Sequence, residues 1–220
     1  MQNRHSPTIE DYLSILFVLQ RDNEPIVGAR LAELLGVTPP TVTNTLKRMA
    51  RDGLVVMDDP RNTRLSEAGW EAACSVMRRH MLIEWLLSRM VGWSKSHSQA
   101  HAMEHVISAE LEEALINDLS NPKTCPHGNP LPGFEQVVAA WVPLTSLSVG
   151  EKGIIRRIHE LAEQTEGVLP YLEEKRLLPG CPIEMIEVLP FNQTVTLRVE
   201  GQPVTLGFAL ARYIFVEQLP

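Results

Sequence analysis

The residue types in this sequence best suited to chemistry are histidines and carboxylates at a spacing typical of metal ligands. Four of them recur at positions i, i+4, i+7 and i+8 of one segment: His97, His101, Glu104 and His105. On a single helix they would share one face, with neighbouring donors about 6 Å apart. Imidazole and carboxylate groups that converge in this way can bind a divalent cation.

Two smaller groups repeat the same chemistry. His80 and Glu84 stand at i, i+4, and Cys125 and His127 place a thiol and an imidazole within three residues. A solvated helix face with scattered histidines would explain any one of these residues. Most of the seven histidines in the chain belong to the groups, however, and this clustering favours metal binding.

Composition sets outer limits on the function. The chain has 220 residues, of which 44% are hydrophobic, and no apolar run long enough to span a membrane. The first residues lack the apolar core of a signal peptide, so we expect a cytoplasmic protein without a membrane partner. Three widely spread cysteines do not predict a disulfide framework. The net charge of −7 argues against a surface that attracts nucleic acid everywhere, but it permits a local basic patch.

The first 65 residues predict a winged helix-turn-helix. A short helix over residues 28–35 ends at Gly36, and Thr38 followed by Pro39 is typical of the start of the next helix, which runs to Arg51. Residues 54–57 and 63–65 then predict the two strands of a β-hairpin wing.

The second helix of this motif would enter a DNA major groove. Small or hydrogen-bonding residues in its first turns can contact base edges, and the cations behind them and on the wing can reach phosphates. We expect base-edge contacts from Thr38, Pro40, Thr41 and Asn44, and backbone contacts from Thr43, Lys47, Arg48, Arg51, Arg61 and Arg64. A helix-turn-helix used only for packing is the alternative.

The rest of the sequence predicts two long helices, then a proline-rich stretch and then short strands. One long helix from Ser66 to about Met90 and another from about Ser96 to Leu119 are expected, the first apolar on more than one face, which favours a partner subunit. A proline-rich stretch over 122–146 predicts a linker. Short runs of strand type then follow at 153–158, 183–188, 195–199 and 202–206, which is consistent with a small β-barrel.

Several segments in this order resemble the diphtheria toxin repressor family; they are residues 40–42, 51–55, 78–87, 104–106 and 128–133. The resemblance covers nearly the whole chain. It implies a mainly α protein with a small β domain: a winged helix-turn-helix over 1–65, a helical dimerisation and metal-binding domain over 66–121, the proline-rich linker over 122–146 and an SH3-like β-barrel over 147–220. Members of the family are metal-activated repressors that sense Fe²⁺ or Mn²⁺.

The resemblance also implies a primary metal site formed by Asp11, His101, Glu104 and His105. Asp11 belongs to the first expected helix of the chain, which follows Thr8, carries the apolar stripe Leu13, Leu16, Phe17 and Leu19 and is broken at residues 21–25. One cation there would tie the DNA-binding domain to the dimerisation domain. Manganese-type members resemble this chain in having Asp there, whereas iron-type members have Met. The chain departs from both types at His101, and from the manganese type at Ser14, which replaces a Glu that those members use for a second metal.

A second, ancillary site is implied by His80 and Glu84 with either His97 or the pair Cys125 and His127. The pair is found in relatives that keep the SH3-like domain, and this domain usually adds a carboxylate. The candidates in this chain are Glu160, Glu163 and Glu166.

The function expected on these grounds is a homodimeric, metal-activated transcriptional repressor that binds double-stranded operator DNA and controls metal homeostasis genes. The cofactor would be Mn²⁺, slightly favoured over Fe²⁺, with Zn²⁺, Co²⁺ or Cd²⁺ able to bind in vitro. No catalytic residues and no small organic substrate are expected. One alternative is a winged-helix regulator of another ligand with a structural zinc site. A metallohydrolase is the other, and neither HExxH nor a comparable catalytic motif occurs.

Overall fold

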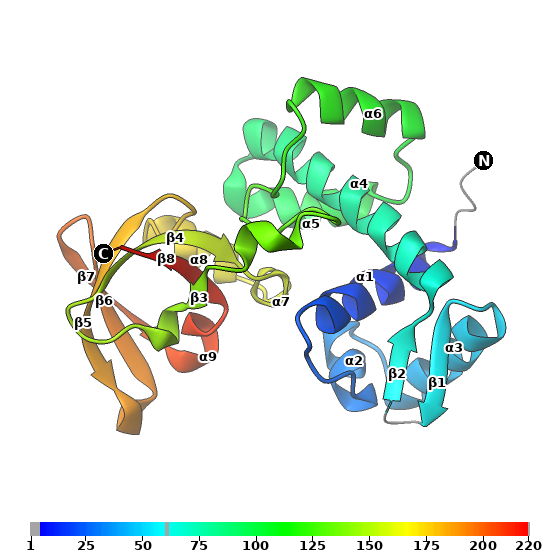
Figure 1. Cartoon of the computed structure of the whole chain (residues 1–220), viewed down its shortest axis with the longest axis horizontal. Helices are drawn as coiled ribbons and strands as arrows, with labels where there is room; N and C mark the ends of the chain where they lie inside the picture. Colours follow the sequence, from blue (N-terminus) through cyan, green and yellow to red (C-terminus); the bar gives the residue numbers. More distant parts are fainter. Residues whose placement is uncertain (1–4, 60–61, 220) are drawn as a thin grey trace. The chain divides into compact units, whose positions relative to one another are not determined.

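The computed structural model describes residues 5–59 and 62–219, which form two compact units. The first unit holds the chain up to Arg79 together with Glu104–Ile107, and the second holds His80–Met103 and the chain from Ser108 onward (Figure 1). The long helix α4 (Glu67–Val91) begins in the first unit and continues into the second. Within the described ranges, every helix is too short or too polar to cross a membrane.

The first unit contains the predicted winged helix-turn-helix. Its elements are α1 (Pro7–Arg21), α2 (Gly28–Leu34), α3 (Pro39–Arg51), β1 (Val55–Asp59) and β2 (Asn62–Leu65). The backbone N–H of Thr41 donates to the Thr38 side chain, so Thr38 caps α3 as its sequence position predicts. Val42, Leu46 and Met49 lie on the buried face of α3, and β1 pairs with β2 as an antiparallel hairpin. The helix-turn-helix and the wing are therefore confirmed.

Helix α4 starts where the sequence predicts and is covered more completely than expected. The Ser66 hydroxyl oxygen accepts a hydrogen bond from the Gly69 N–H at 3.0 Å, which caps the helix. Met81, Ile83 and Leu87, which the sequence assigns partly to a partner subunit, are already buried in the single chain. At the end of the helix Met90 is 71% exposed, so an uncovered apolar surface remains there.

The expectation of one helix from Ser96 to Leu119 is wrong. The structure has two helices, α5 (Trp93–Met103) and α6 (Ala109–Asp118). The Ser108 side chain accepts from the Leu111 N–H at 3.1 Å and starts α6, while the Arg79 Nε–H donates to the Glu104 carbonyl at 3.0 Å. Glu104 and His105 therefore lie in a turn after α5, and not on a helix face shared with His97 and His101.

The stretch predicted as a linker is largely packed into the second unit. Residues 125–132 are all buried, unlike an exposed proline-rich tether. Indole N–H groups hold its backbone, since Trp85 donates to the Thr124 carbonyl at 2.7 Å and Trp93 donates to the Pro126 carbonyl at 3.0 Å. These hydrogen bonds replace the solvent that a linker backbone would need.

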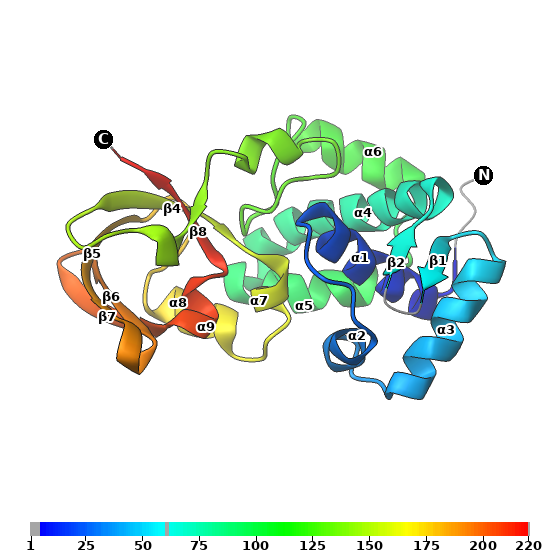
Figure 2. The same ribbon diagram turned by 60° about the horizontal axis from the view of Figure 1, so that its bottom comes forward.

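A curved, six-stranded antiparallel sheet forms most of the remaining second unit (Figure 2). Its strands, in spatial order, are β3 (Val142–Pro143), β8 (Ile214–Gln218), β4 (Lys152–Ile158), β5 (Pro182–Leu189), β6 (Thr194–Val199) and β7 (Gln202–Gly207). The sheet encloses a core that includes Ile155, Met185, Leu197 and Val216. The four predicted strands correspond to β4–β7, and the SH3-like fold is confirmed.

Short helices complete this unit. They are α7 (Glu160–Glu163), α8 (Val168–Glu174) and α9 (Phe208–Ala211), with 3-10 turns at Glu135–Val138, Leu144–Ser146 and Pro190–Asn192. Helix α5 packs against α8, and the Ser94 hydroxyl of α5 donates to a Glu173 carboxylate oxygen of α8. These contacts bring α5 and the sheet domain into one unit.

Candidate functional site

The exposed face of α3 carries the residues predicted to contact DNA. Those that are exposed are Thr38, Pro40, Thr41, Thr43, Asn44, Lys47, Arg48 and Arg51, with Arg64 exposed on β2. Arg61 lies outside the described residues. The Thr43 hydroxyl donates to the Pro39 carbonyl at 3.1 Å, and the Thr38 oxygen is engaged in the cap, so both side chains are held in place.

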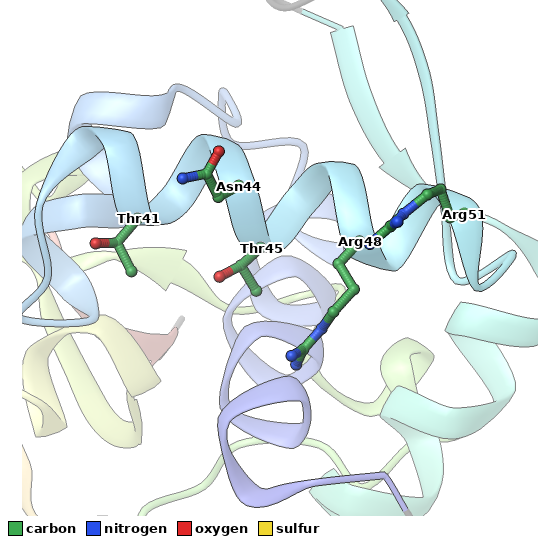
Figure 3. Close-up of a pocket in the computed structure, with 5 residues that line it drawn as sticks. All are labelled: Thr41, Asn44, Thr45, Arg48 and Arg51. Atoms are coloured by element: carbon green, nitrogen blue, oxygen red, sulfur yellow. The ribbon is translucent and has the colours of Figure 1, made fainter.

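A hollow runs along this face and is lined by Thr41, Asn44, Thr45, Arg48 and Arg51 (Figure 3). Thr41, Thr45 and Arg48 point to the same side of α3, as expected for positions i, i+4 and i+7. Thr45 was absent from the predicted set because it borders the apolar stripe of the helix. The combination of hydroxyl, amide and guanidinium groups offers donors for base edges next to donors for phosphates.

The first candidate metal centre, which we term the α1 cluster, gathers Asp11, Glu104 and His105. Their ligand atoms all lie within 4.8 Å of one another. His105 Nε2 is 3.3 Å from Asp11 Oδ1 and 3.7 Å from Glu104 Oε1. The cluster joins α1 to the turn after α5 although the two segments are far apart in the sequence. Two carboxylates and an imidazole at these distances form a suitable partial ligand set for a divalent ion.

Two residues that the sequence analysis missed support this cluster. Glu10 Oε2 lies 2.7 Å from His105 Nδ1 and 3.2 Å from a guanidinium nitrogen of Arg79, and both Glu10 and Arg79 are buried. With the Nδ1 proton donated to Glu10, the Nε2 lone pair of His105 faces Asp11 and Glu104. A carboxylate that orients a ligating imidazole in this way fixes its tautomer.

His101 belongs to a different compact unit from Asp11, Glu104 and His105. It lies exposed on α5, in the second unit, whereas Asp11, Glu104 and His105 belong to the first. Its role as a fourth ligand therefore stays a prediction.

The second candidate centre, which we term the buried cluster, lies wholly within the second unit. Its side chains come from α4, α5, the packed 125–132 segment and α7, and they are His80, Glu84, His97, Cys125, His127 and Glu163. Glu84 Oε1 is 3.0 Å from His80 Nε2, 2.9 Å from His97 Nδ1 and 3.4 Å from His127 Nδ1. Separations near 3 Å are those of two ligands that share one metal ion.

The geometry bears on both alternatives that the sequence left open. His97 and the pair Cys125 and His127 all reach the same carboxylate, Glu84, so the two options are not exclusive. Among the candidate acids, Glu163 Oε2 is 2.9 Å from His97 Nδ1, whereas Glu160 pairs with Arg157 at 3.0 Å. Glu166, the third candidate, is exposed.

Burial and charge shift the protonation of the buried cluster. Burial alone would raise the pKa of Glu84, but the charges of His127 and His80 outweigh it and hold that pKa well below its ordinary value. Burial would lower the pKa of His97, yet the charge of Glu163 and hydrogen bonds to Glu163 and Glu84 raise it to about 9. The pKa of His127 is also raised, because Glu163 and Glu84 overcome the effect of its burial. Burial, followed by the charges of Glu84 and Glu163, raises the pKa of the Cys125 thiol well above its ordinary value.

A shell of hydrogen bonds orients these groups. His127 Nε2 lies 3.2 Å from the Trp93 carbonyl, which directs Nδ1 toward Glu84 and Glu163. The Asn129 amide donates to Glu163 Oε1, and Arg157 Nε donates to the Asn129 side-chain oxygen at 2.6 Å. Glu84 Oε2 is buried with no hydrogen-bond partner among the described residues. A buried carboxylate oxygen without a donor is costly in a protein interior, and a cation beside it would remove that cost. The residues present therefore fit a metal ion.

Comparison with known proteins assigns each part of the chain. Residues 5–62 match the iron dependent repressor N-terminal DNA binding domain, and residues 66–133 match the iron dependent repressor metal binding and dimerisation domain. Residues 142–218 match the FeoA domain.

Whole proteins match as well. The iron-dependent repressor IdeR of Mycobacterium tuberculosis is 33% identical over 226 residues, covering 96% of this chain and 97% of that protein. The diphtheria toxin repressor of Corynebacterium diphtheriae is 33% identical over 223 residues with the same coverage. A solved structure of a manganese-dependent transcriptional repressor in complex with manganese is 26% identical, with a TM-score of 0.82 over 96% of this chain and 100% of that one. The chain therefore belongs to the diphtheria toxin repressor family of metal-dependent transcriptional regulators.

Proposed function

We propose that this protein is a repressor whose binding to operator DNA is switched on by one divalent cation at Asp11, His101, Glu104 and His105. The observation that carries the proposal is the α1 cluster. Asp11 sits on α1 of the DNA-binding domain, and Glu104 and His105 sit in the turn after α5. His101 is included because it precedes Glu104 by three positions and adds a second imidazole to the set.

Charge explains how a cation would act there. Asp11 and Glu104 bring two carboxylates close together, and without a cation their repulsion opposes the joining of α1 to the turn. A bound dication offsets this repulsion and restrains α1, which packs in the same unit as α3. The cation would thus favour one arrangement of the DNA-binding helices over a more mobile one.

The metal that best suits the α1 cluster is Mn²⁺ or Fe²⁺. Carboxylate-rich sets with imidazole nitrogens suit both ions, and Zn²⁺, Co²⁺ and Cd²⁺ would bind in vitro because affinity for such donors rises along the divalent series. We favour Mn²⁺ over Fe²⁺ because Asp11 supplies a hard oxygen where a softer donor would favour iron. The buried cluster would form the ancillary site.

Two copies of the chain are needed for specific operator binding. The α3 face and wing carry a net positive charge of about two on an otherwise acidic protein, which gives one winged helix little affinity for DNA. A dimer can engage two half-sites at a fixed spacing, and the exposed Met90 and Val91 at the end of α4 offer apolar surface for it. Because the target is chromosomal DNA, we place the protein in the cytoplasm.

The test compares Glu104→Gln with Glu110→Gln, a change at an exposed carboxylate of α6. DNA would first be selected from a randomised duplex pool by metal-loaded wild-type protein, and binding then titrated with Mn²⁺, Zn²⁺ and, anaerobically, Fe²⁺. We expect Glu104→Gln to lose most of the metal-dependent affinity and to keep its circular dichroism spectrum, whereas Glu110→Gln behaves as wild type. Full activation of Glu104→Gln would refute the site. Chelation separates the alternative of a structural zinc site, because that protein would unfold, whereas a sensor stays folded and releases DNA.

A further inference from the structure

We propose that the buried cluster binds two divalent transition-metal ions at once, with Glu84 and Glu163 as bridging carboxylates. The inference rests on the proposed function only in taking the buried cluster as a metal site. It goes further by assigning two ions where an ancillary site requires one.

The number of ligands is the first argument. One nitrogen from each of three imidazoles, both oxygens of two carboxylates and one sulfur make eight donor atoms: those of His80, His97 and His127, of Glu84 and Glu163, and of Cys125. A four-coordinate ion uses four donors. The donor atoms of this cluster therefore match two such ions, whereas one ion would leave about half of them without a metal.

The arrangement of the ligands is the second argument. They form two sets that share Glu84, one with His80 and His97 and the other with Cys125 and His127. Glu163 faces both sets with different oxygens, since Oε2 is 2.9 Å from His97 Nδ1 and Oε1 is 3.7 Å from His127 Nδ1. Glu163 therefore presents one oxygen to each set, as expected of a carboxylate that bridges a metal pair about 3.5–4 Å apart, while Glu84 reaches both sets through Oε1.

Burial is the third argument. The side chains of Glu84 and Glu163 are both 1% exposed and that of His127 is fully buried, so none of these three has access to water in place of a metal. Glu84 Oε1 faces three imidazoles while Oε2 has no hydrogen-bond partner among the described residues, as expected of an oxygen that awaits a second ion. Two dications also balance two carboxylates and one thiolate to within one charge, and a buried site needs such a balance.

The two positions differ in chemistry. The set with His80 and His97 offers only nitrogen and oxygen, whereas the other adds the sulfur of Cys125. A thiolate favours softer ions such as Zn²⁺ over Mn²⁺. We therefore expect the Cys125 position to fill first with Zn²⁺ or Co²⁺, and the His80 position to accept a second ion of the same or a harder kind.

Metal counting on full-length protein tests the proposal. In a Glu104→Gln background, which weakens the α1 cluster, the ions retained after equilibrium dialysis against Co²⁺ or Zn²⁺ would be counted by elemental analysis. The double variant His80→Gln with Cys125→Ser serves as the blank for adventitious binding, and circular dichroism verifies that each variant is folded. Above the blank we expect two ions per chain in the background protein, and one ion each after His80→Gln alone and Cys125→Ser alone.

Spectra identify which position is filled. The thiolate-to-cobalt charge-transfer band should persist in the folded His80→Gln variant and vanish in Cys125→Ser, and two equivalents of Co²⁺ in the background protein should show exchange coupling in electron paramagnetic resonance. A count of one ion above the blank in the background protein, or two uncoupled ions, overturns the metal pair. Metal-dependent DNA binding by wild type would then still stand, so failure of this proposal is distinguishable from failure of the proposed function.

Discussion

Metal binding at the buried cluster should release protons, and His97 sets the minimum number. In the metal-free protein the charge of Glu163, against the opposing effect of burial, raises the pKa of His97 to about 9. At pH 7.5 the ring is therefore about 97% protonated, because the pH lies roughly 1.5 units below the pKa. Its Nδ1 is the nitrogen that faces Glu84 and Glu163, so this proton must leave before the ring can bind a metal.

The pKa of His97 also sets the magnitude of the effect. Deprotonation of His97 at pH 7.5 costs about 2 kcal/mol, and the loss of this one proton should by itself raise the apparent metal affinity about tenfold for each pH unit up to pH 9. The raised pKa of the Cys125 thiol adds a second proton when sulfur binds, whereas Glu84, whose pKa is lowered, is already ionised and adds none. We expect about two protons released per filled cluster at pH 7.5, and more if His127 contributes.

Stability of the metal-free protein should have the opposite pH dependence. A pKa raised in the folded state means that the His97 contribution is fully present below the unfolded value of 6.5 and is lost as the pH rises toward about 9. This contribution amounts to at most about 3 kcal/mol. Alkaline conditions should therefore weaken the metal-free fold while they strengthen metal binding.

Isothermal titration calorimetry in two buffers of different ionisation enthalpy measures the released protons directly. His97→Gln and Cys125→Ser should each lower the number by about one relative to wild type, while Glu110→Gln, at an exposed site, leaves it unchanged. A binding enthalpy that does not depend on the buffer would refute the reasoning, since it would mean that the cluster is deprotonated before the metal arrives.

Two further predictions concern the DNA-binding face of α3 and the start of α4. Asn44→Ala should weaken DNA binding by about 1–3 kcal/mol at one base position and relax sequence specificity at that position. Lys47→Ala should instead weaken binding to all duplexes alike and reduce the salt dependence of binding. If both variants lost affinity uniformly across a panel of base substitutions, the assignment of Asn44 to a base and Lys47 to phosphate would be wrong. Gly69→Ala should lower the free energy of unfolding by at least about 2 kcal/mol in chemical denaturation, because its Cβ would stand 1.8 Å from the Leu54 carbonyl oxygen. Gly28→Ala is the control: its Cβ would have no atom within 4 Å, so this variant should be neutral or slightly stabilising.

Local signals in the sequence predicted the fold well where periodicity and capping agree. Thr38 followed by Pro39 predicted the start of α3, and the spacing of Val42, Leu46 and Met49 predicted its buried face. The strands β4–β7 were visible as short apolar runs. The edge strand β3 was missed because it has two residues, and β8 was missed although Ile214, Phe215 and Val216 form a short apolar run of the same kind.

The sites were predictable by residue type more than by position. Glu10 stands beside Asp11 in the sequence, yet its partners are Arg79 and His105. The spacing of residues within one helix does not predict contacts with residues so distant in the sequence. Glu163 could not be told from Glu160 for a related reason, because the salt bridge of Glu160 with Arg157 depends on the backbone turn from the end of β4 into α7. In each case the deciding contact joins residues on different elements.

The break between α5 and α6 is the point where spacing alone misled, and it changes how metal binding is organised. An unbroken helix from Ser96 to Leu119 would hold His97, Glu104 and His105 on one rigid face, so that a single site would compete for all of them. The cap at Ser108 and the hydrogen bond from Arg79 instead place Glu104 and His105 in a turn of the first unit, while His97 remains on α5 in the second. Each compact unit thus holds its own cluster with its own carboxylates. Ligands eight positions apart in the sequence can then serve separate ions, because the backbone between them belongs to different units.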